Sequence, residues 1–193
     1  MNDRARLDRR WLIALLALHL VSLLLSLIAY LPIPNGWIYW IRKAISVGVI
    51  LCLFLLTPAD LRYRKAAFFR TAVFCCTMLS LLLSAPAADL IFSLLNTLFS
   101  IAACWFEYRA HGGLTPCSGP GLARGWLALF FASLVLTLLS WAIVLVYALL
   151  PGGVPVATAT VTSTTTLILS DLLEAAYVVL LFFTVYKTKT LSA

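Results

Sequence analysis

Long apolar runs alternate with short polar connections along the chain, and six runs are long enough for a membrane-crossing helix. About 20 helical residues cross the roughly 30 Å of hydrocarbon in a bilayer. Prolines, glycines and charged residues separate the runs. The pattern predicts an all-α protein with one membrane domain over residues 1–193. Its expected spans are residues 11–31, 37–57, 66–84, 87–108, 126–150 and 165–186.

Two connections differ from the other, shorter ones. Residues 111–125 are rich in glycine and contain Pro116 and Pro120, which predicts a flexible linker. Residues 151–164 consist mainly of valine and threonine and carry no charge. We expect the second segment to be a loop that connects two spans, with a lid over a pocket as the less favoured interpretation.

Composition supports the membrane class. The chain is 63% hydrophobic and 11% charged, whereas roughly a quarter of the residues in a soluble globular domain are charged. The formal net charge of +7 could suggest nucleic acid as a partner. However, no nucleic-acid-binding motif is present, so we expect no nucleic-acid partner and take the lipid bilayer as the surroundings.

The basic residues predict the topology. Cytoplasmic connections of membrane proteins carry an excess of lysine and arginine. With six spans, twelve of the fourteen basic residues fall on the side of the two chain ends, and only Arg42 and Lys43 fall opposite. We therefore expect both termini in the cytoplasm. The short connections favour the plasma membrane of a bacterium.

Five of the six runs carry a polar stripe with helical spacing. Residues three and four positions apart share one face of a helix, so these stripes are expected to meet on the bundle axis. Small hydroxyl residues also line ordinary helix contacts in membranes, which leaves packing as an alternative. The stripes contain His19, Ser22 and Ser26; Arg70, Thr77, Ser80 and Ser84; Asp89, Ser93, Asn96, Ser100 and Glu107; Ser133, Thr137, Ser140 and Tyr147; and Ser170, Asp171, Glu174 and Tyr177.

The carboxylates of the last run need a partner or a function, because an acid at mid-bilayer costs roughly 2.5 to 3.5 kcal/mol. By helical rise, Asp171 lies at about the same depth below the outer membrane face as Arg42 and Lys43. We expect Arg42 or Lys43 to face Asp171. Glu174 is expected deeper, near His19, with Asp89 at the rim.

Three hypotheses explain such a cluster. It is a structural ion pair, a pocket that binds a cationic or polyhydroxy solute from outside, or a proton relay through Glu174 and His19. The pocket hypothesis names nine candidate substrate-binding residues: Asp171, Glu174, Arg42, Lys43, Asp89, His19, Asn96, Tyr177 and Tyr147.

Enzymatic chemistry finds little support in the sequence. No GxSxG elbow, HExxH pair or CxxC pair is present. Cys75, Cys76 and Cys104 lack the usual spacing of metal ligands, so we expect neither a metal nor a cofactor. The sequence favours a non-enzymatic protein that binds a small polar solute as part of a transport system. The alternative is a membrane scaffold or accessory subunit whose charge cluster holds its helices or a partner subunit together.

Overall fold

The structure, a computed structural model, describes the backbone of residues 3–30, 36–83, 86–114, 120–149 and 156–190. It describes side chains for residues 9–30, 36–83, 91–114, 121–147, 158 and 160–187. The described residues form six α-helices and no strand. They are α1 (Asp3–Ala29), α2 (Gly36–Leu55), α3 (Leu61–Leu83), α4 (Pro86–Gly113), α5 (Pro120–Leu149) and α6 (Val156–Thr190).

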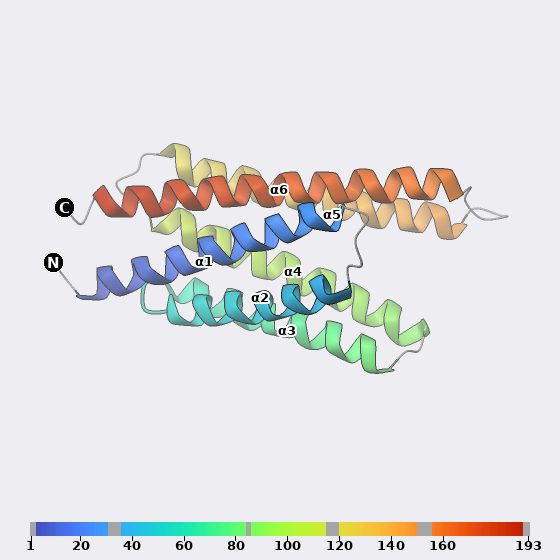
Figure 1. The fold of residues 1–193 in the computed structure, drawn as a ribbon, viewed down its shortest axis with the longest axis horizontal. Helices are drawn as coiled ribbons and strands as arrows, with labels where there is room; N and C mark the ends of the chain where they lie inside the picture. Colours follow the sequence, from blue (N-terminus) through green and yellow to red (C-terminus); the bar gives the residue numbers. More distant parts are fainter. Residues whose placement is uncertain (1–2, 31–35, 84–85, 115–119, 150–155, 191–193) are drawn as a thin grey trace.

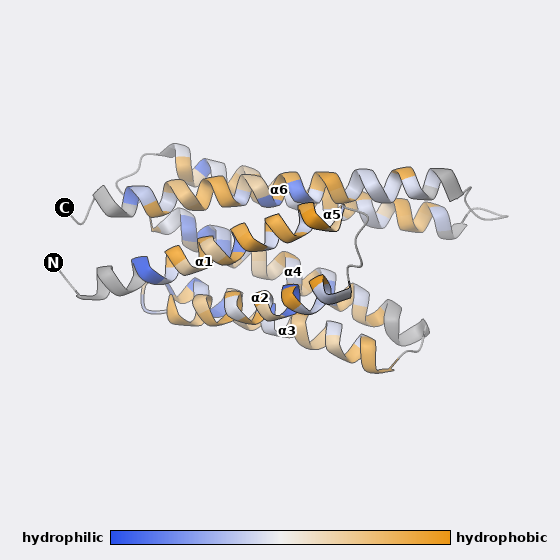
Figure 2. Ribbon diagram, in the orientation of Figure 1, coloured by the Kyte–Doolittle hydropathy of each residue, from blue (hydrophilic) through white to orange (hydrophobic). Residues whose placement is uncertain are grey.

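Each helix contains a segment long and apolar enough to cross a membrane. Figure 2 shows hydrophobic residues along most of every helix. Many large apolar side chains are exposed, such as Leu82 and Val135, which suits contact with lipid. These features confirm the all-α prediction of six spans and indicate a multi-pass integral membrane protein.

The helices form a closed ring in chain order. Each helix packs against the next one along the chain, and α6 returns to pack against α1. The start of α1 and the end of α6 lie at the same end of the bundle (Figure 1), as an even number of antiparallel helices requires. We call this the terminal end.

Several helices extend beyond their expected spans. The segment 111–125 was expected to be a linker, but α4 continues to Gly113 and α5 begins at Pro120. The segment 151–164 was expected to be a loop, but α6 begins at Val156. Residues 156–164 contain no glycine or proline. The helix propensities of their threonines and valines are only moderately low, so this segment can be helical. The leader before Trp11 is also helical from Asp3.

The hydrophobic core lies in the half of the ring nearest the terminal end. Its residues come from the first part of α1, α3 and α5 and from the last part of α2, α4 and α6. Among them Leu15, Leu53 and Leu181 are completely buried. Antiparallel neighbours place these segments at one height, so the ring is most tightly packed there.

This packing predicts different effects for two leucines of α6. Leu181 is completely buried, whereas Leu172 is 60% exposed. Leu181→Ala should lower the free energy of unfolding by about 2 kcal/mol, because it leaves a cavity that the rigid ring fills poorly. Leu172→Ala should change it by less than about 0.5 kcal/mol. Unfolding of both variants in detergent micelles measures the difference, and equal effects would contradict this core.

Candidate functional site

A buried ion pair joins α3 to α4 inside the ring. Arg70 donates from Nε and Nη2 to Oε2 of Glu107, at 2.7 Å in each case. The Glu107 side chain is completely buried, and that of Arg70 is 27% exposed. A buried carboxylate is tolerated when a counter-charge and hydrogen bonds satisfy its oxygens.

Hydrogen bonds extend this pair to α6 and back to α3. Tyr177 donates its hydroxyl hydrogen to Oε1 of Glu107 at 2.5 Å. His111 lies with Nε2 3.1 Å from the Tyr177 hydroxyl and with Nδ1 2.8 Å from the Tyr63 hydroxyl. We call Arg70, Glu107, Tyr177, His111 and Tyr63 the polar layer. It ties three helices together at the height of the buried core.

The polar layer assigns the hydrogen of His111. Because Tyr177 gives its hydrogen to Glu107, its oxygen can only accept a further hydrogen bond. A neutral His111 that carries its hydrogen on Nε2 donates to Tyr177 and accepts from Tyr63 at Nδ1. The indole ring of Trp126 packs on the imidazole of His111, with 4.7 Å between the ring centroids. Nε1 of Trp126 donates a hydrogen bond to Thr184 of α6. Every polar atom of this histidine is therefore satisfied.

A cavity of about 230 Å³ lies beside the polar layer and is lined from four helices. The charged or titratable side chains in its wall are His19, Arg42, Arg70 and Glu174. Ser22, Ser46, Ile45 and Val49 complete the lining. Arg70 belongs both to the polar layer and to the wall of the cavity. Its ion pair with Glu107 therefore borders the cavity.

His19 links the cavity to the polar layer. Its Nδ1 lies 3.8 Å from Oε1 of Glu174, the neighbour expected from the sequence. Its ring packs on that of Tyr177 with 4.4 Å between centroids. Its other nitrogen, Nε2, is buried and has no hydrogen-bond partner among the residues that the structure describes.

The expected pairing of Arg42 or Lys43 with Asp171 is not among the ion pairs of the described side chains. Arg42 instead donates from Nη2 to Ser26 at 2.7 Å and lines the cavity with Glu174. Asp171 accepts a hydrogen bond of 2.7 Å from the Tyr30 hydroxyl. Lys43 lies over the ring of Tyr39. Matching depths placed these residues at similar heights but did not determine their positions around the ring.

The remaining candidates lie apart from the cavity or outside the described side chains. Tyr147 hydrogen-bonds Thr162 at 2.6 Å, twelve residues before Glu174 in α6. Asn96 is partly buried, its Oδ1 has no hydrogen-bond partner in the described part of the chain, and it does not line the cavity. Tyr177 belongs to the polar layer. The side chain of Asp89 is outside the described part of the chain.

Arg70 and Glu107 belong to predicted polar stripes but are not among the predicted site residues, and His111 falls in the predicted linker. One signal could have identified the layer: Glu107 and His111 are four residues apart, a spacing that places both on one helical face. The glycines after His111 suggested an earlier helix end. The helix includes both of them and ends at Gly113.

Comparison with protein-family models, curated proteins and solved structures gives no match to this chain.

The polar layer predicts a strong response to loss of one charge. Glu107→Gln leaves the guanidinium of Arg70 without its counter-charge and should lower the free energy of unfolding by about 3 kcal/mol or more. The double variant Arg70→Met, Glu107→Leu removes both charges and should lose less than the single variant. Unfolding in detergent measures both.

Glu174→Gln serves as the control, because Glu174 is 22% exposed and its partner His19 is more distant. We expect it to change the free energy of unfolding by about 1 kcal/mol or less. If Glu107→Gln behaves like Glu174→Gln, the polar layer is not the stabilising element described here.

Proposed function

We propose that this protein binds a small polar solute in the cavity between α1, α2, α3 and α6, as part of a transport system. The observation that supports this most is that Arg42 and Glu174 both line the cavity yet form no ion pair with each other among the described side chains. A purely structural cluster would be expected to pair its charges directly. Here they lie separately around a space.

The size and charge of the cavity narrow the class of solute. A volume of about 230 Å³ corresponds to about eight water molecules and suits only a small molecule. Arg70 is paired with Glu107, and His19 lies 3.8 Å from Glu174. The guanidinium of Arg42 and the carboxylate of Glu174 are the opposite charges in the wall that do not pair with each other. A small zwitterion, with its anionic group at Arg42 and its cationic group at Glu174, fits this pattern.

The distribution of packing supports access from the end of the bundle opposite the chain termini. The core lies at the terminal end, and Arg42 lies in the second turn of α2, at the opposite end of that helix. We assign the chain termini to the cytoplasm of a bacterial cell on the bias of the basic residues. The solute would then enter from outside the plasma membrane.

A second candidate function is that of a membrane scaffold or accessory subunit. The satisfied hydrogen bonds of the polar layer favour it, because they stabilise the ring without any ligand. This candidate assigns the charges of the cavity to helix association and requires no solute.

A thermal-shift screen of the purified protein in detergent distinguishes the two candidates. We expect at least one small zwitterion to raise the unfolding temperature, since a ligand at a hundred times its Kd adds about 2.7 kcal/mol. Arg42→Gln and Glu174→Gln should abolish this shift. Lys43→Gln and Asp171→Asn should retain it, because they remove neighbouring charges that do not line the cavity.

The scaffold function makes the opposite prediction for the same proteins. No solute in a library of amino acids, betaines, sugars and small cations would then stabilise the wild type. Arg42→Gln and Glu174→Gln would themselves unfold at lower temperature than Lys43→Gln and Asp171→Asn. That combination would reject the solute-binding proposal.

A further inference from the structure

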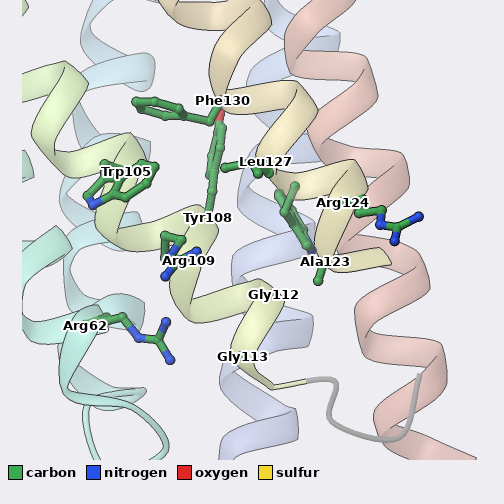
Figure 3. A pocket seen from close by; sticks show the side chains of 11 residues that line it. Arg62, Trp105, Tyr108, Arg109, Gly112, Gly113, Ala123, Arg124, Leu127 and Phe130 are labelled. Carbon is green, nitrogen blue, oxygen red and sulfur yellow. The ribbon is translucent and has the colours of Figure 1, made fainter. Parts of the chain in front are cut away.

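A second pocket, of about 410 Å³, lies between the last turns of α4 and the first turns of α5 (Figure 3). It is separate from the cavity that contains Glu174, and no residue lines both. Its wall combines arginines with aromatic and aliphatic side chains. The lining residues are Arg62, Trp105, Tyr108, Arg109, Gly112, Gly113, Ala123, Arg124, Trp126, Leu127 and Phe130.

The charge of this pocket is positive. Three arginines and no carboxylate line it. Arg62 is paired with Asp60 at 2.7 Å, whereas Arg109 and Arg124 form no ion pair among the described side chains. The nearby carboxylate of Glu107 is already used by Arg70. The pocket therefore has free capacity for an anionic group.

Arg62 and Arg109 are held in place by their neighbours. Asp60 accepts hydrogen bonds from the Arg62 backbone and from its Nε. The guanidinium of Arg62 lies against Gly113, where an added Cβ would come within 2.7 Å of Nη2. Arg109 lies over the ring of Trp105 at 5.3 Å. Two guanidinium groups are thus fixed at one edge of the pocket.

Charged and apolar groups occupy different depths. At 1.5 Å per residue, Arg109 lies about 6 Å from the end of α4 and Trp105 about 12 Å from it. Phe130 lies about 15 Å from the start of α5 by the same rise. Figure 3 shows Arg62 and Arg109 toward Gly113, with Trp105 and Phe130 deeper along the helices. A phospholipid has the same order, with its phosphate at the interface and its acyl chains below.

We propose that this pocket binds an anionic phospholipid, with the phosphate at Arg62 and Arg109 and an acyl chain along Trp105, Leu127 and Phe130. Basic pockets between membrane helices suit anionic head groups, and tryptophan is typical of the interfacial depth. A soluble phosphate compound would also bind the arginines, but it has no acyl chain to contact the apolar wall. The proposal is independent of solute binding at Glu174.

Native mass spectrometry of the full chain tests the proposal, with phosphatidylglycerol and phosphatidylcholine of identical acyl chains as probes. We expect tighter binding of phosphatidylglycerol. Removing one arginine should weaken phosphatidylglycerol binding about fivefold. The double variant Arg62→Gln, Arg109→Gln should therefore raise the Kd for phosphatidylglycerol about 25-fold. Arg9→Gln with Arg10→Gln is the matched control, since it removes two cations of α1 outside the pocket, and should leave the Kd nearly unchanged.

Further arms identify the source of the phosphate and keep the test independent of folding. Glycerol 3-phosphate and inorganic phosphate should compete poorly, and equal competition would show a soluble ligand and overturn the lipid assignment. If the double variant does not fold, Arg109→Gln alone should still weaken binding about fivefold, because Arg109 is exposed. Equal binding of the two lipids, or equal losses in the pocket and control variants, would also overturn the proposal.

Discussion

The ion pair between Arg70 and Glu107 is the interaction on which the centre of this ring depends. A carboxylate that is completely buried is unfavourable unless its oxygens are satisfied. Arg70 satisfies one oxygen and Tyr177 the other. These partners come from α3 and α6, so the ion pair and hydrogen bond of one α4 side chain hold three helices together. His111 and Tyr63 then complete the layer without adding a charge.

The two pockets differ from the polar layer in how far their polar groups are satisfied. In the layer, each hydrogen-bonding atom of Glu107 and His111 has a partner. In the wall of the cavity, the guanidinium of Arg42 donates to Ser26 and forms no ion pair among the described side chains. In the second pocket, Arg109 lies over the face of Trp105 and forms no ion pair among the described side chains. Unused donors beside a space are what a binding site requires, whereas a satisfied network mainly specifies a structure.

The sequence predicted the helices well because hydrophobic length is a direct signal for a membrane span. It also predicted the contact of His19 with Glu174, since both lie on polar stripes at similar depth. It failed for Arg42 and Asp171, because depth along a helix does not determine its rotation or its place in the ring. Ser26 and Tyr30, both near the end of α1, take the places of the expected partners.

If the protein binds a solute as proposed, the polar layer closes the path from the cavity along the axis of the helix ring. Arg70 lines the cavity and pairs with Glu107, so a solute moving from the cavity along the ring axis would meet a closed ion pair. Beyond it, toward the terminal end, lie the buried rings of Trp126 and Tyr63 and the leucines of the core. Opening this path would separate a buried pair, at a cost of several kcal/mol, and would disturb the packed half of the ring. A subunit that captures its solute and relies on a partner for translocation avoids that cost, which favours a binding component over a self-contained channel.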